Sequence, residues 1–400
     1  MSLDVYIGPN GFGKTTKLNN VRDDLIDSKG VPKNEIIFLN SEILLVDEMK
    51  DTRDESKTME FIINEVLSTP ALEIARQQYE EAVDNEINAN VDRINKIIDD
   101  ILSINNQDRN IKKGKSSESL KNFIETTEQK EYKKLVKINR EIAEKKMGSG
   151  QKMQLILALI KESSKSYIFL DEPEKYSHPS LLHKTAKLIE EISKTKTVYM
   201  ATHSPKLLSM IDLDISRIFI FNDNSYTPKV IDFVKVCNKY SSYAKKAGLK
   251  KKELTYFNET TLRDNIKKFH YRDFIEALFS KRVYLVEGIN DILFINKMLR
   301  DNNLYYEDYK ILPSYGKHRM MLFAELFESL DIEVHLYFDE DDVSHMIHSY
   351  TNTELCKFRH YYIFKENLED DLKFIGDKSN QIDFSNHLES IIIDSKYICS

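Results

Sequence analysis

The sequence predicts an α/β protein with two parallel sheets, and three observations support this fold class. Short apolar runs alternate with helical segments in both halves of the chain, which is the pattern of a parallel sheet with connecting helices. A glycine-rich loop follows the first apolar run, residues 3–7. Residues 71–147 contain no proline and a single glycine, so they predict long helices between strand-rich segments.

Composition limits the class of protein. A length of 400 residues suggests two domains or slightly more, and a hydrophobic content of 41% is enough for packed cores. The formal net charge of −7 argues against a protein that coats nucleic acid indiscriminately, so a nucleic-acid contact must come from a local basic patch. Cys237, Cys356 and Cys399 form no C-x-x-C pair, which argues against a disulfide framework or a zinc site.

The same features predict a location. The first strand starts almost at the initial methionine, so we expect no signal peptide, and no apolar run approaches membrane-spanning length. Scattered cysteines fit a reducing compartment. We therefore expect a cytoplasmic protein with no membrane partner.

The strands can be placed from the apolar runs. After the first strand, they are expected at 36–39, 166–170, 197–200 and 218–221 in one half, and at 282–286, 334–338 and 361–364 in the other. We expect a first domain at 1–236, a helical linker at 237–280 and a second domain at 281–400. Lysines 245–246 and 250–252 make this linker basic; a solvated face is the favoured interpretation and a nucleic-acid contact the alternative.

Residues 71–147 predict a helical hairpin inserted into the first domain. Apolar residues recur at alternating steps of four and three, as in the seam of a short coiled coil, and a weaker seam returns after a polar turn. The first seam consists of Ile87, Val91, Ile94, Ile98 and Ile101, and the second of Leu135, Ile138 and Ile142. Two ordinary helices packed on the domain are the alternative.

The loop after the first strand fits the phosphate-binding pattern G-x-x-x-x-G-K-[ST]. Backbone N–H groups of such a loop surround the β- and γ-phosphates of a nucleotide, the lysine reaches the same phosphates, and the hydroxyl binds Mg²⁺. Lys14 and Thr15 are expected in these two roles. The expected ATP contacts in this loop are Gly8, Pro9, Asn10, Gly11, Phe12, Gly13, Lys14, Thr15 and Thr16.

Two further motifs would complete a hydrolysis site. The strand at 166–170 is followed by Asp171 and Glu172; we expect Asp171 to bind Mg²⁺ and Glu172 to polarise the attacking water. His203 follows the strand at 197–200, where a histidine could sense the γ-phosphate. A histidine at a strand end is more often structural, but its position after the paired acids favours the catalytic role.

The segment Met147-Gly148-Ser149-Gly150-Gln151 opens a helix, and a helix N-terminus binds phosphate. It resembles the signature motif of ABC-type ATPases, with Leu-Ser-Gly-Gly replaced by Gly-Ser-Gly. In that family the signature caps the ATP of a partner subunit. The resemblance implies that Ser149, Gly150 and Gln151 contact the ATP of a second chain, which gives a homodimer or a higher even-numbered oligomer. The family's Q-loop is not clear; Asn40 or Glu42 could take its place.

A coiled-coil insertion between the two phosphate motifs resembles SMC-like ATPases rather than transporters. Residues 171–179, Asp-Glu-Pro-Glu-Lys-Tyr-Ser-His-Pro, resemble the D-E-P-E-x-x-x-H-P run of the OLD (overcoming lysogenization defect) family of ATPase-nucleases and related defence ATPases. His178 in this run is interpreted as a dimer-contact or loop-packing residue.

A second group of acids follows the strands of the second half. Glu287 and Gly288 follow the strand at 282–286, and Asp291 opens the next helix. Residues 339–342 are all acidic, and residues 367–370 contain two more acids after the third strand. Oxygen ligands gathered at one sheet edge suit Mg²⁺ or Mn²⁺, which can activate water at a phosphodiester.

This arrangement resembles a Toprim domain, with a glutamate on the first strand, a later Asp-x-Asp and a third acid. Residues 269–281 and Tyr315-Gly316-Lys317 also resemble the OLD family. The resemblance implies a catalytic metal site, with Lys317 or Lys365 as a candidate to stabilise the transition state. The metal ligands implied are Glu287, Asp291, Asp339, Asp341 and Glu369, all of them catalytic except Asp291.

The two motif sets together predict an ATP-hydrolysing, divalent-metal-dependent nuclease that serves in defence against phage or mobile DNA. ATP and Mg²⁺ are the expected cofactors of the first domain, and Mg²⁺ or Mn²⁺ that of the second. Nucleic acid is the expected partner, with DNA favoured over RNA, and a second defence protein is a further candidate. The alternative is an SMC-like sensor whose non-cleaving Toprim domain docks a partner effector.

Overall fold

The computed structural model describes residues 2–44, 58, 61–69, 71, 74–75, 77–79, 81–82, 85, 148–222, 227–249, 258–289, 291–292, 295–296, 309–339 and 346–364. It divides into two compact units. Unit 1 consists of residues 1–2 and 20–198, and unit 2 of residues 3–19 and 199–400. The predicted hairpin lies almost wholly outside the described residues, so it stays a prediction.

The first sheet has five strands, hydrogen-bonded in the order β2-β3-β4-β1-β5. They are β1 (Ser2–Ile7), β2 (Ile36–Asn40), β3 (Tyr167–Asp171), β4 (Thr197–Thr202) and β5 (Ile218–Ile220). β1 pairs with β5, and β2 with β3, in parallel. The predicted strands of the first half are therefore confirmed as a parallel sheet.

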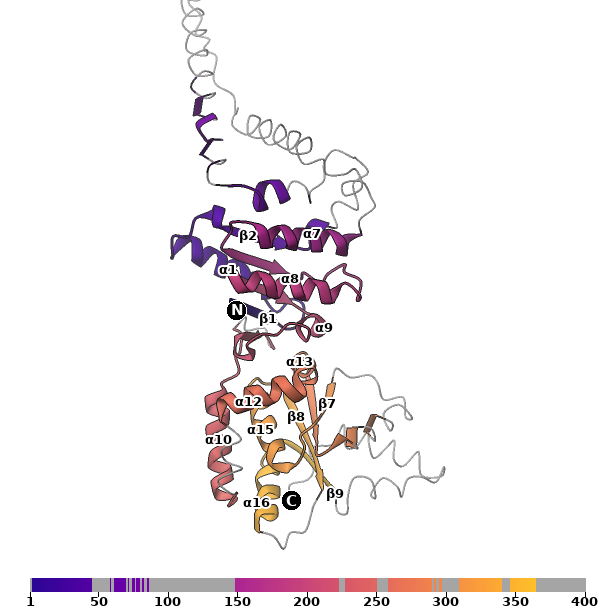
Figure 1. Cartoon of the computed structure of the whole chain (residues 1–400). Helices are drawn as coiled ribbons and strands as arrows, with labels where there is room; N and C mark the ends of the chain where they lie inside the picture. The colour runs from indigo at the N-terminus through magenta and orange to yellow at the C-terminus, as the bar shows by residue number, and fades with distance from the viewer. Residues whose placement is uncertain are drawn as a thin grey trace, which may run out of the picture. The chain divides into compact units, whose positions relative to one another are not determined.

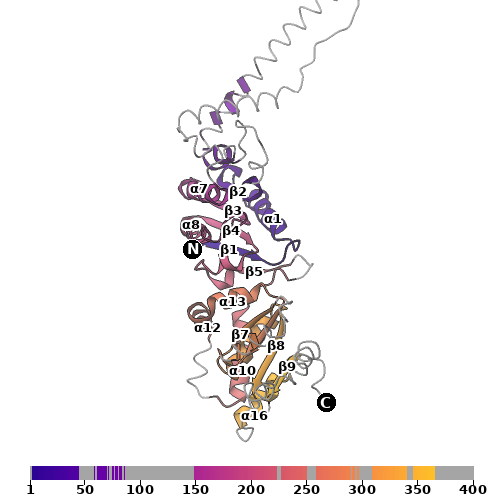
Figure 2. The ribbon, with the colours of Figure 1, turned by 90° about the vertical axis from the view of Figure 1, so that its right-hand side faces the viewer.

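Helices cover both sides of the strands in unit 1. α7 (Ser149–Glu162) and α8 (Leu182–Thr195) lie on one side of β2 and β3, and α1 (Lys14–Asp27) lies on the other (Figure 2). α8 buries Leu182, Thr185, Ala186, Ile189 and Ile192, which recur at the spacing of one helix face. This apolar stripe explains why a helix forms here and which side faces the sheet.

The second sheet lies in unit 2 and has four parallel strands in the order β7-β6-β8-β9 (Figure 1). They are β6 (Arg282–Val286), β7 (Tyr309–Pro313), β8 (Glu333–Asp339) and β9 (His360–Phe364). The sequence analysis did not predict β7, because a lysine and a proline interrupt its apolar run. An edge strand tolerates both residues, since one of its sides makes no ladder hydrogen bonds.

Further helices are described in unit 2. They are α9 (Pro205–Leu208), α10 (Phe233–Lys246), α12 (Glu259–Asn265), α13 (Tyr271–Leu278), α15 (Lys317–Glu328) and α16 (Met346–Leu355), with a π-helical turn at Ile266–His270. Phe274 of α13 and Phe327 of α15 are fully buried with ring centroids 5.6 Å apart. No helix in the part of the chain described here is long and apolar enough to cross a membrane.

A buried chain of hydrogen bonds joins α10, α15 and α16. The Tyr243 hydroxyl lies 2.8 Å from Thr351 Oγ1 and 2.7 Å from His318 Nδ1. Thr351 uses its single proton to donate to the carbonyl of Ile347, so it must accept from Tyr243. His318 then donates from Nδ1 to the tyrosine oxygen. Burial raises the pKa of Tyr243 to about 12, which keeps the donating proton in place.

Removing this hydroxyl should destabilise unit 2. Tyr243→Phe leaves two buried polar partners without their hydrogen bond, so we expect unfolding to become easier by about 1–3 kcal/mol. Chemical denaturation followed by circular dichroism measures the change. Tyr79→Phe is the matched control, because Tyr79 is 50% exposed and should lose almost nothing. Equal stability of Tyr243→Phe and the parent would contradict the assigned network.

Candidate functional site: two motif sets at strand ends

The glycine-rich loop in unit 2 has a backbone that requires its glycines. Gly8, Gly11 and Gly13 have φ values of 142°, 85° and 93°, in the region that residues with a Cβ rarely adopt. A Cβ on Gly8 would lie 2.3 Å from the carbonyl oxygen of Phe221. Backbone conformation at all three positions, and lack of space at Gly8, therefore favour glycine, and a loop without side chains allows close approach to a phosphate.

Lys14 begins α1 and folds back over this loop. Its ammonium donates to the carbonyl oxygens of Gly8, at 2.7 Å, and Pro9, at 2.9 Å, and its side chain is buried. A positive charge is thus held inside the loop. Thr15 and Thr16 follow on the exposed side of the first helical turn. The residues present fit a triphosphate with its Mg²⁺, as the sequence predicts.

The paired acids Asp171 and Glu172 lie in unit 1 at the end of β3. Asp171 is buried, and Glu172 has a positive φ of 51°, an uncommon conformation that is often kept at functional sites. Lys175 forms ion pairs with Glu172, at 3.4 Å, and with Glu42, at 3.5 Å. Partial burial opposes the charge on Lys175, but the charge of Glu172, the hydrogen bond to it and the charge of Glu42 together raise the pKa of the lysine.

Both Q-loop candidates lie next to these acids within unit 1. Asn40 is the register partner of Asp171 between β2 and β3, and the backbone N–H of Ser41 donates to the Asp171 carbonyl at 3.3 Å. Glu42 is connected to Glu172 through Lys175. Both residues therefore lie close to the acidic strand end.

The Gly-Ser-Gly segment packs on the loop that follows Glu172. The Ser149 hydroxyl donates to the Tyr176 carbonyl at 2.9 Å. A Cβ on Gly150 would lie 2.9 Å from Leu181 Cδ1 and 3.2 Å from Ser177 Cα, so a larger residue here would require both neighbours to shift. The Gln151 side chain accepts from the N–H of Gly148 at 3.2 Å and caps the start of α7.

The two histidines of the first motif set have different surroundings. His178 Nδ1 lies 2.8 Å from the Ser180 hydroxyl within one exposed turn, in keeping with a loop-packing role. His203 is exposed directly after β4, and the next residue, Ser204, caps α9 by accepting from the N–H of Leu207 at 3.1 Å. His203, the predicted γ-phosphate sensor, therefore lies between the end of β4 and the start of α9.

The second sheet brings Glu287, Asp339 and Lys317 together in unit 2. Glu287 and Asp339 lie at the ends of the adjacent parallel strands β6 and β8, and Glu287 Oε1 accepts from the N–H of Asp339 at 2.9 Å. The Lys317 ammonium lies 3.7 Å from Glu287 Oε1 and donates to the carbonyl of Asp339. Of the two lysine candidates, Lys317 is therefore in contact with the predicted site, whereas Lys365 lies outside the described residues.

A strained turn carries Lys317 into this position. Tyr315 and Gly316 have positive φ values of 55° and 112°, and the N–H of Gly316 donates to the Glu287 carbonyl at 3.1 Å. Ser314, fully buried, donates from both its N–H and its hydroxyl to the Val286 carbonyl. These bonds fix the turn to the end of β6, so Lys317 opens α15 beside Glu287.

The other predicted ligands are only partly described. Asp291 uses Oδ2 to accept from the N–H of Gly288 at 2.8 Å, which places it over the turn that follows Glu287. Asp341 and Glu369 lie outside the described residues. Within the described ranges, the group whose ligand atoms all lie within 4.8 Å of one another is a different one, Glu333, His335 and His360, which the sequence analysis did not single out.

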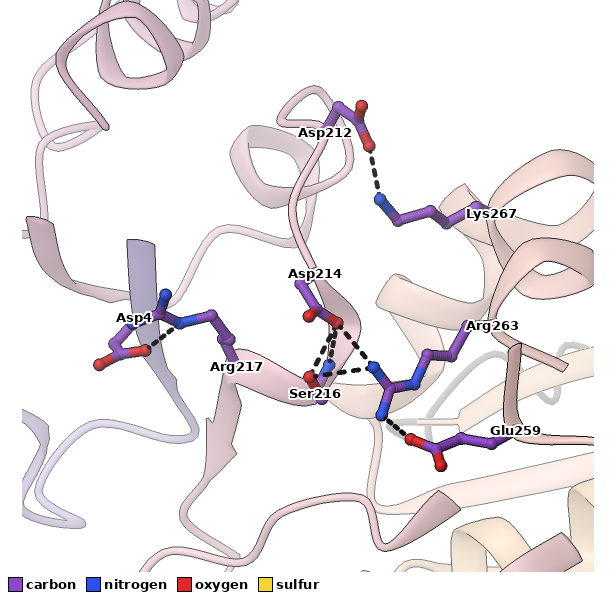
Figure 3. A network of polar contacts seen from close by, with 8 residues as sticks. All are labelled: Asp4, Asp212, Asp214, Ser216, Arg217, Glu259, Arg263 and Lys267. Atoms are coloured by element: carbon purple, nitrogen blue, oxygen red, sulfur yellow. Dashed lines mark hydrogen bonds and ion pairs between the residues drawn. The ribbon is translucent and has the colours of Figure 1, made fainter. Parts of the chain in front are cut away.

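Polar contacts in unit 2 connect the segment that follows α9 to the helices that precede β6. Arg217 binds Asp4 of β1 at 2.6 Å, Arg263 of α12 binds Glu259 and lies 3.5 Å from Asp214, and Lys267 lies 2.8 Å from Asp212 (Figure 3). The Tyr271 hydroxyl at the start of α13 donates to the Ile211 carbonyl at 2.5 Å.

The network ties the segment after α9 to the helices that lead into β6. Partial burial of Asp214 opposes its ionisation, but hydrogen bonds from Ser216 and the charge of Arg263 lower its pKa, which keeps it ionised.

Comparisons with known proteins agree with both motif sets. A family model described as an AAA ATPase domain matches residues 24–208, and one described as an overcoming lysogenization defect protein-like TOPRIM domain matches residues 278–341. No curated protein matches the chain. The first range includes Asp171, Glu172 and His203, and the second includes Glu287 and Asp339.

The chain is therefore an AAA-type ATPase domain followed by a Toprim domain. The Toprim part is of the overcoming-lysogenization-defect type, so the resemblance seen in the sequence is confirmed.

The position of Lys317 predicts an effect on metal binding. Lys317→Met removes a positive charge 3.7 Å from Glu287, so Mn²⁺ should bind about tenfold more tightly without nucleotide. Calorimetric titration measures this affinity. Lys317→Arg keeps the charge and should bind like the parent, and Lys310→Met, which removes another ion-paired lysine of the same unit, should also leave the affinity unchanged. Unchanged binding by Lys317→Met would place the metal elsewhere.

Proposed function

We propose that this protein is an ATP-hydrolysing nuclease that cuts a phosphodiester with Mg²⁺ or Mn²⁺ and serves in defence against phage or mobile DNA. The observation that carries the proposal is the contact of Glu287, Asp339 and Lys317 at the ends of adjacent parallel strands. Two carboxylates supply hard oxygen ligands, and a buried ammonium can balance the charge that develops on a phosphorane.

In the proposed nuclease site, Glu287 and Asp339 hold a divalent metal, with Asp291, Asp341 and Glu369 as further ligands. The metal lowers the pKa of a bound water and neutralises the phosphate. Lys317 is fixed by the Ser314–Gly316 turn and donates toward the site rather than toward solvent. Its role in the proposal is to stabilise the leaving or bridging oxygen.

In the proposed ATPase, Lys14 binds the phosphates, Thr15 and Asp171 hold Mg²⁺, Glu172 polarises water and His203 senses the γ-phosphate. The glycine backbone of the loop and the buried, inward-folded Lys14 support the first of these roles. The positive φ of Glu172 supports its role in polarising water, because uncommon backbone conformations are retained where a side chain must be aimed.

A second copy of the chain is proposed to complete each ATP site. Ser149 is at the N-terminus of the 14-residue helix α7, whose unpaired N–H groups and dipole attract phosphate. Gly150 and the Tyr176 carbonyl fix that N-terminus on the loop after Glu172. ATP would then join two chains, and the network around Tyr271 and Arg263 would carry the ATP state toward β6.

The domain limits 1–236, 237–280 and 281–400 remain part of the proposal, as do a cytoplasmic location, a nucleic-acid substrate with DNA favoured, and a second defence protein. The described lysines of the linker, Lys245 and Lys246, lie in the last turn of α10. They could add phosphate contacts to the substrate. The alternative is a non-cleaving Toprim domain that docks an effector. Such a domain would have the same motifs and the same fold as a cleaving one.

The two activities should be separable by mutation. Asp339→Ala removes a metal ligand from the second sheet, so cleavage of plasmid DNA with Mn²⁺ should fall by at least about 100-fold while ATP turnover stays within about twofold.

Glu172→Gln should abolish ATP turnover and leave nucleotide binding intact. Gel assays of plasmid cutting and phosphate release measure both.

The control is Asp264→Asn, which changes an exposed acid of α12 and should alter neither activity. Full cleavage by Asp339→Ala would remove the Toprim acids from the nuclease. A parent protein that hydrolyses ATP but cuts neither DNA nor RNA with either metal would favour the sensor alternative.

A further inference from the structure

Three side chains of the second sheet converge at the beginning of its strands, away from Glu287 and Asp339. Glu333 and His335 are two residues apart on β8, so they project from the same face of the sheet. His360 on β9 is the register partner of His335. Two donors at alternate positions of β8 and a third donor on the neighbouring strand β9 are therefore held close together by the sheet.

The distances among these donors suit a metal ion. Glu333 Oε1 lies 2.8 Å from His335 Nε2 and 3.6 Å from His360 Nε2, and all three ligand atoms lie within 4.8 Å of one another. Two ligands bonded at about 2.0–2.2 Å to a tetrahedral ion are separated by about 3.3–3.6 Å. Each imidazole nitrogen binds a metal in the plane of its ring, and the two rings are nearly parallel, so one ring would turn out of its stacked orientation to seat an ion among the three side chains.

The surroundings orient these ligands. Arg282 Nε binds the other carboxylate oxygen of Glu333 at 3.2 Å, leaving Oε1 directed at the histidines. The His335 and His360 rings are stacked at 4.4 Å, and the Tyr284 ring lies 5.0 Å from His335. Metal ligands commonly have such partners, which fix their orientation. Glu333 is 39% exposed on its side chain, so an ion has a path from solvent.

His335 is suited to binding as a neutral imidazole. Burial lowers the pKa of His335 to about 4 despite the opposing hydrogen bond to Glu333, and the nearby His360 acts in the same direction as burial. At neutral pH a lone pair is therefore available, once the ring proton resides on the nitrogen that faces away from the carboxylate.

We propose that Glu333, His335 and His360 form a binding site for a borderline transition metal such as Zn²⁺, distinct from the Mg²⁺ or Mn²⁺ site of the Toprim acids. Two imidazole nitrogens and one carboxylate oxygen favour Zn²⁺, Co²⁺ or Ni²⁺ over Mg²⁺, which takes oxygen ligands. The bound ion would join β9, an edge strand, to the central strand β8 and so stabilise the second sheet.

The test uses the untagged full chain after treatment with a chelator. Co²⁺ is added in the presence of excess Mg²⁺, which saturates the carboxylate sites, and visible absorption reports nitrogen-containing coordination of low symmetry. We expect one Co²⁺ per chain in this form, displaced by one Zn²⁺, and a higher melting temperature with Zn²⁺ than without it.

His360→Asn and Glu333→Gln should each weaken Co²⁺ binding by at least about tenfold, as expected for loss of one ligand from a three-ligand site. Each variant is checked for a metal-free melting temperature close to the parent's, so that a folding defect is recognised. His183→Asn changes an exposed histidine of α8 and should bind Co²⁺ like the parent. An absorption band that survives both site variants would overturn the proposal. The absence of any absorption band in the parent would also overturn it and would give the cluster a purely structural role through its hydrogen bonds.

Discussion

The arrangement of the Toprim site depends on one hydrogen bond, from the N–H of Asp339 to the Glu287 carboxylate. This bond joins the ends of β6 and β8 and aims Glu287 along the sheet edge. Lys317 then contacts both residues, because the turn at Ser314–Gly316 is itself bonded to the end of β6. Lys317 is buried, and its contacts with Glu287 and the Asp339 carbonyl give its ammonium the partners that a buried charge needs.

The same unit also connects this edge to the ATPase motifs. Tyr271 and Arg263 contact the segment that follows α9, and α13 continues directly toward β6 and Glu287. Short, packed elements therefore lie between His203 and Glu287 in this unit. The opposite end of the sheet has its own charged group, where Arg282, Glu333 and the two histidines hold β8 and β9 together.

Much of the fold could be predicted from sequence, because hydrophobic periodicity and the residue types of turns are local features of the chain. Apolar runs ending in Asp171 or Glu287 identified strands, and Gly8, Gly11 and Gly13 identified a phosphate loop. β7 was missed because an edge strand accepts Lys310 and Pro313. The choice of Lys317 over Lys365, and the grouping of Glu333 with His360, depend on strand order and register, which no local pattern contains.

The central claim, that Glu287 and Asp339 hold a catalytic divalent metal beside Lys317, is tested most directly by crystals of the full chain soaked in Mn²⁺. Anomalous scattering locates the ion without reference to any activity. We predict a peak within bonding distance of the Glu287 and Asp339 carboxylates, with the Lys317 ammonium still adjacent. Mn²⁺ bound only at the P-loop or at the histidine cluster, with none between Glu287 and Asp339, would contradict the account.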